Sequence, residues 1–207
     1  MKTSNKPVIL IGSGGHAGVL VEILEANRIQ TLGIVDPNKK IGAKYFGLEV
    51  IGNDSLIRQH SPKEIYLVNG LGSLPGVNTR WEISEKFRSL EYKFLSLIHP
   101  NASVSRDVKI GEGAQIMNGS IIQHGVTIGK DCILNTGIII DHNCSIGNYG
   151  HLAPGCVLSG GVSVGERVHI GTGSSIIQNI EIGNNVIIAA GSIIHKNINS
   201  ETTYLKK

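Results

Sequence analysis

The sequence predicts two domains: a small Rossmann-like α/β (βαβ) domain, and after it a β-solenoid, a parallel β-helix built of hexapeptide repeats. Three observations predict this fold class. Aliphatic residues recur at every sixth position from Ile98 onward, glycines recur every eighteen residues within that repeat, and residues 1–97 alternate strand and helix patterns. We therefore place the domain boundary between residues 97 and 98.

The N-terminal domain begins with the segment "PVILIGSGGHAGVLVEILEANR", residues 7–28, which has the pattern of a buried strand, a glycine turn and an amphipathic helix. A second strand, "TLGIVD", ends at Asp36, a third is expected in "EIYLVNG", residues 64–70, and a helix in residues 78–90. Strands that alternate with helices predict a parallel sheet.

The glycine turn of this domain is not a dinucleotide fingerprint, because Ala17 occupies the place of the third glycine. The helix start at Gly14, Gly15 and His16 can still bind a phosphate or a ribose edge through its free amides. The alternative is a tight turn that only packs the helix on the strand.

The hexapeptide repeat runs for seventeen consecutive positions without a miss, which a helical period of 3.6 does not produce. The residue two places before each aliphatic position is nearly always small or β-branched. This pattern predicts that each six-residue unit is a short strand and a turn, and that three units close one triangular coil. The aliphatic positions are Ile98, Val104, Ile110, Ile116, Ile122, Ile128, Leu134, Ile140, Ile146, Leu152, Leu158, Val164, Ile170, Ile176, Ile182, Ile188 and Ile194.

Glycines support a coil of eighteen residues, because they recur at that step and stack one type of turn along one corner: Gly111, Gly129, Gly147, Gly165 and Gly183.

Cys132, Cys144 and Cys156 fall on the small-residue position, so we expect buried structural thiols rather than a metal or nucleophile site. An odd number of cysteines without a paired motif agrees with a reducing compartment, the cytoplasm.

Composition excludes several classes of function. The net charge is +3, and the basic residues are scattered, so no nucleic-acid partner is expected. The first residues, "MKTSNKPVILIGSGGH", fit neither a signal peptide nor a membrane span.

Four segments carry a family resemblance over almost the whole chain: "GSGGHA", "GLEVIGND", "LIHPNASVS" and "DHNCSIGNYGH". They resemble the bacterial sugar acetyltransferases of the sialic-acid O-acetyltransferase family, which includes N-acetyltransferases of nucleotide-linked 4-amino-6-deoxy sugars such as the bacillosamine-pathway enzyme. The resemblance implies a left-handed β-helix and a homotrimer that binds acetyl-CoA between neighbouring helices. It also implies that residues 1–97 bind the nucleotide-sugar, that residues 98–207 bind acetyl-CoA and trimerise, and that no metal is needed.

The resemblance also implies roles for individual residues. His142 is the expected base, with Asp141 and Asn143 beside it; many family members have an acidic residue where Asn143 stands, so Asp141 or another subunit would supply the charge. His151, Gly160, Gly161 and Ala190 are expected to contact acetyl-CoA, with amides near Gly160 donating to the thioester oxygen. Gly14, Gly15, His16 and Asp36 are expected to contact the nucleotide-sugar.

The spacing of the histidines bears on these roles. His142 and His151 are nine residues apart, half a coil, so they lie on different sides of the triangle and more than about 10 Å apart in one chain. That separation favours a site made by two subunits. His124 lies one coil before His142, and we expect the two imidazoles to stack at about 4.8 Å, which would disfavour double protonation. The same step relates His151 and His169.

The predicted function is acetyl-CoA-dependent N-acetylation of a UDP- or dTDP-linked 4-amino-6-deoxy sugar in surface-glycan biosynthesis. One alternative is O-acetylation of sialic acid or a similar free sugar. Another is a zinc-dependent trimer of the carbonic-anhydrase type that uses His124, His142 and His151. A third is a non-catalytic scaffold.

Overall fold

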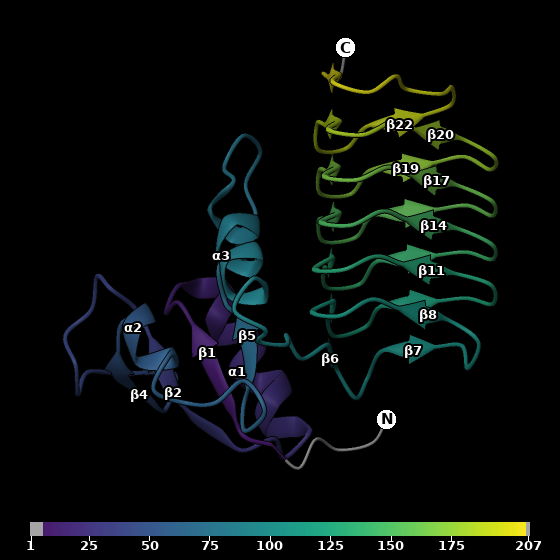
Figure 1. The fold of residues 1–207 in the computed structure, drawn as a ribbon. Coiled ribbons are helices and arrows are strands. Elements are labelled where there is room, and N and C mark those ends of the chain that lie inside the picture. The colour runs from purple at the N-terminus through teal and green to yellow at the C-terminus, as the bar shows by residue number, and fades with distance from the viewer. Residues whose placement is uncertain (1–5, 206–207) are drawn as a thin grey trace. The chain divides into compact units, whose positions relative to one another are not determined.

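A computed structural model describes residues 6–205 and divides the chain into two compact units, Met1–Leu97 and Ile98–Lys207. The first unit is a five-stranded sheet in the order β3-β4-β2-β1-β5 with helices packed on it (Figure 1). Its elements are β1 (Val8–Ile11), α1 (Gly15–Ala26), β2 (Thr31–Val35), β3 (Lys44–Tyr45), β4 (Leu48–Gly52), α2 (Asp54–Ile57), β5 (Tyr66–Asn69) and α3 (Thr79–Arg88).

Strand β1 lies inside this sheet and pairs in parallel with β2 on one side and with β5, the edge strand, on the other. All four residues of β1 are buried, as the apolar run in the sequence predicts. Because the order of strands reverses at β1, the loop that follows β1 lies where open α/β sheets bind their ligands.

The hairpin of β3 and β4 was not among the strands expected from the sequence. Strand β4 pairs in parallel with β2, and Gly33 of β2 allows this close approach. A Cβ on Gly33 would lie 2.6 Å from the Ile51 side chain and 2.8 Å from the carbonyl oxygen of Glu49. The strand is only five residues long, between Gly47 and Asn53, so its pattern in the sequence is weak.

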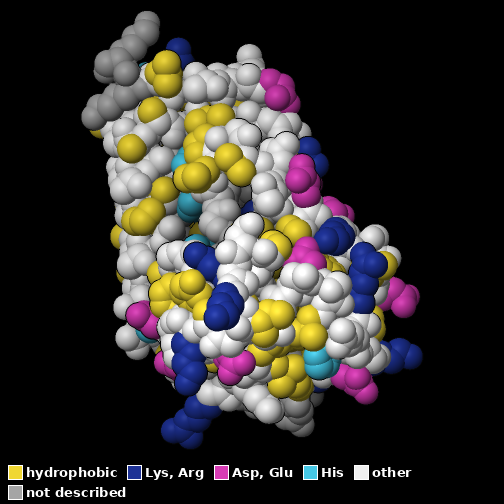
Figure 2. Space-filling model, turned by 90° about the vertical axis from the view of Figure 1, so that its left-hand side faces the viewer, with side chains coloured by type: hydrophobic (Ala, Val, Ile, Leu, Met, Phe, Trp, Pro, Cys, Tyr) yellow, Lys and Arg dark blue, Asp and Glu magenta, His cyan; other side chains and the backbone are white. Residues whose placement is uncertain are grey.

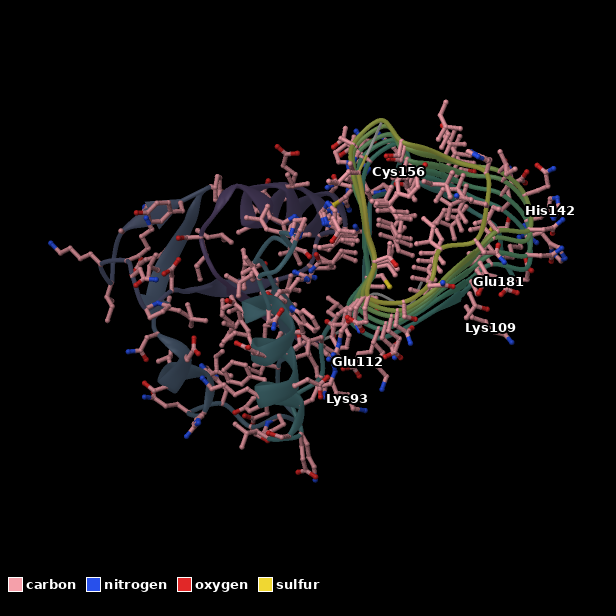
Figure 3. The ribbon with its side chains drawn as sticks, turned by 90° about the horizontal axis from the view of Figure 1, so that it is seen from above. Lys93, Lys109, Glu112, His142, Cys156 and Glu181 are labelled. Carbon is pink, nitrogen blue, oxygen red and sulfur yellow. The ribbon has the colours of Figure 1, made fainter. Side chains whose placement is uncertain are left out.

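The second unit is a parallel β-helix with three sheets, as the repeat predicts (Figure 1). Seen from its C-terminal end, the chain passes clockwise from the Cys156 corner to the His142 corner while it rises toward the viewer (Figure 3), so the β-helix is left-handed. This confirms the implied handedness, which is opposite to the usual crossover preference.

The six-stranded sheet contains β7 (Ser103–Val104), β10 (Ile121–Ile122), β13 (Ile139–Ile140), β16 (Val157–Leu158), β19 (Ser175–Ile176) and β22 (Ile193–Ile194). The five-stranded sheet contains β8 (Lys109–Ile110), β11 (Thr127–Ile128), β14 (Ser145–Ile146), β17 (Ser163–Val164) and β20 (Glu181–Ile182). The seven-stranded sheet contains β6 (Leu97–Ile98), β9 (Gln115–Ile116), β12 (Ile133–Leu134), β15 (His151–Leu152), β18 (His169–Ile170), β21 (Ile187–Ile188) and β23 (Thr203–Tyr204).

The core of the β-helix is formed by the aliphatic positions and by the small residues two places before them. Cys132, Cys144 and Cys156 belong to this core as free, buried thiols, which confirms their predicted burial. Burial raises the pKa of Cys156 to about 11, so its thiol stays protonated at neutral pH.

The glycines of the eighteen-residue step are required by the close approach of successive coils. A Cβ on Gly147 would lie 2.6 Å from the carbonyl carbon of Gly165, and a Cβ on Gly165 would lie 2.7 Å from that of Gly183. Backbone atoms cannot move aside as a flexible side chain can, so only glycine fits this corner.

The regular lattice ends after Ile194, but the β-helix continues with a shorter coil. Ile182 pairs with Ile198 and Ile187 pairs with Thr203, so the last coil has a step of sixteen residues instead of eighteen. Two residues are therefore missing from the turn that follows β22. The sequence repeat alone did not predict this extension to Tyr204.

Candidate active site

His142 lies on the corner of the β-helix that joins the six-stranded sheet to the five-stranded sheet, and its side chain points outward from the prism (Figure 3). We call this corner the histidine corner. Residues at the step of eighteen stack along it, in the order Arg106, His124, His142, Gly160 and Gln178.

The His142 imidazole packs on the backbone of the next coil at Gly160. A Cβ on Gly160 would lie 2.5 Å from Cε1 and 2.6 Å from Nε2 of the ring. Only glycine leaves this space, so the residue at position 160 determines where the imidazole lies.

Two neighbours of His142 form hydrogen bonds at this corner. Asp141 Oδ1 accepts the backbone N–H of His142 at 2.7 Å, and Asn143 Nδ2 lies 3.2 Å from His142 Nδ1. Asn143 thus contacts the ring, as expected of a residue that orients it. Asp141 holds the backbone of the turn.

The backbone of Asn143 explains why this residue type suits the turn. Its φ is 58°, a left-handed conformation that asparagine tolerates better than most residues. The Asn143 N–H donates to the carbonyl oxygen of His124 on the preceding coil at 2.9 Å. The Asn143 side chain covers Gly125, where a Cβ would lie 2.4 Å from Oδ1.

His124 and His142 are neighbours one coil apart, but their rings lean in opposite directions. His124 Nδ1 lies 2.9 Å from Asp107 Oδ2, on the preceding coil, while the His142 ring lies over Gly160, on the following coil. The expectation that the two imidazoles stack at about the strand spacing is therefore wrong. Asp107 attracts one ring, and the space above Gly160 accommodates the other.

His151 lies elsewhere, in β15 of the seven-stranded sheet, so the chain does not bring it beside His142. It is buried, and its ring meets the His169 ring edge to face at 4.7 Å, as their spacing predicts. Asn135 Nδ2 lies 3.5 Å from His151 Nε2. Burial lowers the pKa of His169.

The three other residues expected to contact acetyl-CoA occupy two corners. Gly160 and Gly161 follow β16 on the histidine corner, whereas Ala190 lies between β21 and β22 on another corner. The Gly161 N–H donates to the His142 carbonyl at 2.9 Å. Among the hydrogen bonds of the described residues, none engages the Gly160 N–H, so this amide is the donor open to a ligand.

In the N-terminal unit, hydrogen bonds hold the loop after β1 against the end of β2. Ser13 donates to Asp36 Oδ2 through its backbone N–H at 3.1 Å and through its hydroxyl at 2.6 Å, and Asn38 N–H donates to Asp36 Oδ1 at 2.9 Å. Gly14 and Gly15 are exposed at the start of α1, and His16 is half-buried beside them. The predicted substrate-contacting residues therefore cluster where the strand order reverses.

Asn69 and Arg80 were not predicted, although they shape the same edge of the sheet. Arg80 is 4% exposed, and its Nη1 donates to the Asn69 carbonyl at 2.9 Å and also to the Leu71 carbonyl. Asn69 Nδ2 donates to the Arg80 carbonyl at 2.8 Å. In the sequence, Arg80 has the pattern of an exposed helix charge, so only the buried contacts reveal it.

The described residues contain no group of three or more His, Cys, Asp or Glu side chains that could hold a metal ion. None of the helices that the structure describes is long and apolar enough to cross a membrane. On the face shown in Figure 2, lysine and arginine side chains are interspersed with aspartate and glutamate.

Three family models match the chain. They are the PglD N-terminal domain over residues 7–87, the GMPPB C-terminal domain over residues 92–174, and the bacterial transferase hexapeptide (six repeats) over residues 161–196. The fold and the matching family models together define a hexapeptide-repeat transferase.

Solved structures extend the similarity to almost the whole chain. Perosamine N-acetyltransferase from Caulobacter crescentus, solved with CoA and GDP-perosamine, is 32% identical over 96% of this chain and 92% of that one, with a TM-score of 0.86. The acetyltransferase domain of PglB from Neisseria gonorrhoeae, solved with acetyl coenzyme A, is 31% identical over 95% and 94%, with a TM-score of 0.85.

A curated relative, the UDP-N-acetylbacillosamine N-acetyltransferase of Bacillus subtilis, is 36% identical over 115 residues, which is 54% of this chain and 51% of that enzyme. The chain therefore spans about half the length of that relative in the match. With the full-length structural relatives, these findings show that the chain belongs to the hexapeptide-repeat sugar acetyltransferases with a PglD-type N-terminal domain.

Proposed function

We propose that this protein transfers the acetyl group of acetyl-CoA to the 4-amino group of a nucleotide-linked 4-amino-6-deoxy sugar, in the biosynthesis of a surface glycan. The observation that carries this proposal is the similarity over both units to enzymes named as N-acetyltransferases, one solved with CoA and GDP-perosamine. Because these relatives use UDP- and GDP-linked sugars, we add a guanosine nucleotide to the uridine and thymidine that the sequence suggested.

His142 is the proposed base, and its place on Gly160 supports this role. The ring takes the proton that the sugar nitrogen loses while it attacks the thioester carbonyl. The open Gly160 N–H is the proposed donor to the carbonyl oxygen, where negative charge develops. Asn143 orients the ring without adding charge, which suits an amine nucleophile better than a hydroxyl.

The proposed assembly is a homotrimer in which His142 of one subunit and His151 of another face the same acetyl-CoA. Within one chain His142 lies on the corner between the six-stranded and five-stranded sheets and His151 lies in the seven-stranded sheet, and this separation supports a shared site. The outward side of the six-stranded sheet also exposes aliphatic residues that a neighbouring copy would cover: Ile121, Ile139 and Ile193.

The N-terminal unit is the proposed site for the nucleotide-sugar. The exposed amides at Gly14 and Gly15 can donate to phosphate oxygens at the start of α1, with His16 beside them. Asp36, which accepts the Ser13 hydroxyl, fixes the shape of this loop and is the proposed acidic contact of the nucleotide-sugar. Three free, buried thiols fit a reducing compartment, so we place the reaction in the cytoplasm.

Release of CoA thiol tests this function. The wild-type protein would be mixed with acetyl-CoA and UDP-, dTDP- or GDP-linked 4-amino-6-deoxy sugars, with the 4-hydroxy counterparts and free sialic acid as matched acceptors. The proposal expects release only with an amino sugar. Release with sialic acid or with a 4-hydroxy sugar would favour O-acetylation, and no release with any acceptor would favour the non-catalytic alternative.

A further inference from the structure

A second imidazole, His124, carries a carboxylate partner that His142 lacks. Its Nδ1 lies 2.9 Å from Asp107 Oδ2, and Asp107 also accepts the Gly125 N–H at 2.7 Å. The His124 side chain is 78% exposed and the Asp107 side chain 43%, so the pair faces solvent on the histidine corner. Asp107 therefore links the Gly125 turn to the preceding coil and also presents its carboxylate to the His124 ring.

The hydrogen bonds of the two histidines differ in a way that matters for proton transfer. A carboxylate can only accept, so the neutral His124 ring carries its proton on Nδ1 and presents the lone pair of Nε2. The ring is oriented as a base by an aspartate, as in hydrolase triads. His142 Nδ1 faces the uncharged amide of Asn143 instead.

The chemistry of an amino sugar needs two proton acceptors. Near neutral pH an alkylamine is an ammonium ion, which must lose one proton before its nitrogen can attack and a second one after the C–N bond forms. One histidine cannot take both protons without releasing the first one.

We propose that the Asp107–His124 pair is a second base, which deprotonates the sugar ammonium and delivers the neutral amine to the site of His142. This inference rests on the proposed function and adds a residue pair to it. His124 and His142 lie one coil apart on one corner and both side chains are exposed, so a sugar bound along this corner passes the His124 ring and then the His142 ring, although the two rings lean apart.

The proposed steps balance. His124 Nε2 takes one proton from the ammonium, and the resulting imidazolium is paired with the Asp107 carboxylate. The neutral amine forms a bond to the thioester carbon, His142 takes the second proton, and the C–S bond breaks. His142 then protonates the leaving thiolate, while His124 returns its proton to solvent. The net products are the amide, CoA thiol and one released proton.

The charged and titratable groups around His124 are few. Arg106 and Asp107 lie on the coil below, Asp141 and His142 on the coil above, and Gln123 and Gly125 beside it are uncharged. The Gly125 hydrogen bond lowers the pKa of Asp107, and the charge of His124 lowers it further, so the carboxylate is ionised wherever the enzyme would work.

The test is a pH profile of kcat/KM for the amino sugar at saturating acetyl-CoA, with the wild type, His124→Gln and Asp107→Asn. At pH 6.5 we expect each variant to lose about 10- to 100-fold, and at pH 9.5, where more of the amine is already neutral, to lie within about threefold of the wild type. Gln178→Ala, an exposed position three coils further on the same corner, serves as the control.

The double variant should lose no more than either single variant, because the two residues act as one unit. Equal profiles for variants and wild type, or a loss that is constant over the whole pH range, would overturn the second base. Thermal melts of each variant are the control for the fold, and a melting temperature equal to that of the wild type is expected for an intact β-helix. If the wild type releases no CoA with any amino sugar, the proposed function itself fails, which is a different result from an active wild type with unaffected variants.

Discussion

The His142 imidazole lies over the backbone of Gly160, in the space that any side chain at position 160 would occupy. The two residues are eighteen positions apart, one full coil of the β-helix. The place of the proposed base thus depends on a residue without a side chain, which leads to a direct prediction.

Gly160→Ala should displace the ring and leave the fold intact. The added Cβ would lie 2.5 Å from the imidazole, which is exposed and can turn away. A base moved by about 1 Å costs on the order of 100-fold in rate, so we expect kcat to fall about 10- to 100-fold. Steady-state kinetics measure this fall, with Gln178→Ala as the control. An unchanged kcat would show that the place of the His142 ring does not matter.

Asp36 should affect the nucleotide-sugar and not acetyl-CoA. Asp36→Ala removes the acceptor of both Ser13 hydrogen bonds and of the Asn38 N–H. Hydrogen bonds to a charged group contribute about 1.5–3 kcal/mol, so we expect the KM for the nucleotide-sugar to rise about 10- to 100-fold.

Asn38→Ala is the matched control for Asp36→Ala, because it keeps the backbone N–H that Asp36 accepts. Initial rates at varied concentrations of each substrate separate the two KM values. An equal rise in both KM values for Asp36→Ala would contradict a role specific to the nucleotide-sugar.

Two glycines of the β-helix should differ in their effect on stability. A Cβ on Gly147 would lie 2.6 Å from backbone atoms of Gly165, whereas a Cβ on Gly155 meets nothing within 4 Å but must adopt a φ of 69°. We expect Gly147→Ala to cost about 3 kcal/mol of unfolding free energy or more, and Gly155→Ala about 1–2 kcal/mol. Urea unfolding measures both, and equal costs would contradict the steric explanation.

The fold could be predicted largely from the sequence, because the aliphatic positions of a β-helix recur at a fixed step and Ile98 to Ile194 never break it. The shortened last coil could not, since pairing Ile182 with Ile198 requires knowing that two residues are missing from a turn. A short strand such as β4 gives too few residues for a pattern.

The candidate site was predictable in part. The positions of His124, His142 and Gly160 on one corner follow from the repeat, but the direction of each ring depends on a residue of another coil. Asp107 is seventeen residues before His124, so its contact depends on the shape of the turn as well as on the repeat. Arg80 was missed because a buried guanidinium on a helix gives no signal in the sequence.

His169 should make the protein less stable at acidic pH. Burial lowers its pKa, so between the lowered value and 6.5 the unfolded chain binds a proton that the folded chain does not. The contribution of neutral His169 to the free energy of unfolding is therefore present at neutral pH and is lost as the pH falls through that window. His169→Leu removes this titration and should flatten the decrease of the urea midpoint from pH 7.5 to pH 5.

His195→Gln is the control for His169→Leu, because His195 is exposed. The control should keep the decrease at the wild-type size. A decrease that is as large in His169→Leu as in the wild type would show that other groups cause the acid sensitivity.

The most direct test of the central claim is to identify the product of a single turnover. The wild type and His142→Ala would each be mixed with acetyl-CoA and the nucleotide-linked 4-amino-6-deoxy sugar that supports thiol release, and the product examined by mass spectrometry and NMR. We predict one acetyl group on the C4 nitrogen with the wild type, formed at least about 100-fold more slowly by the variant. An acetyl group on a hydroxyl oxygen, or equal rates for the two proteins, would contradict the account.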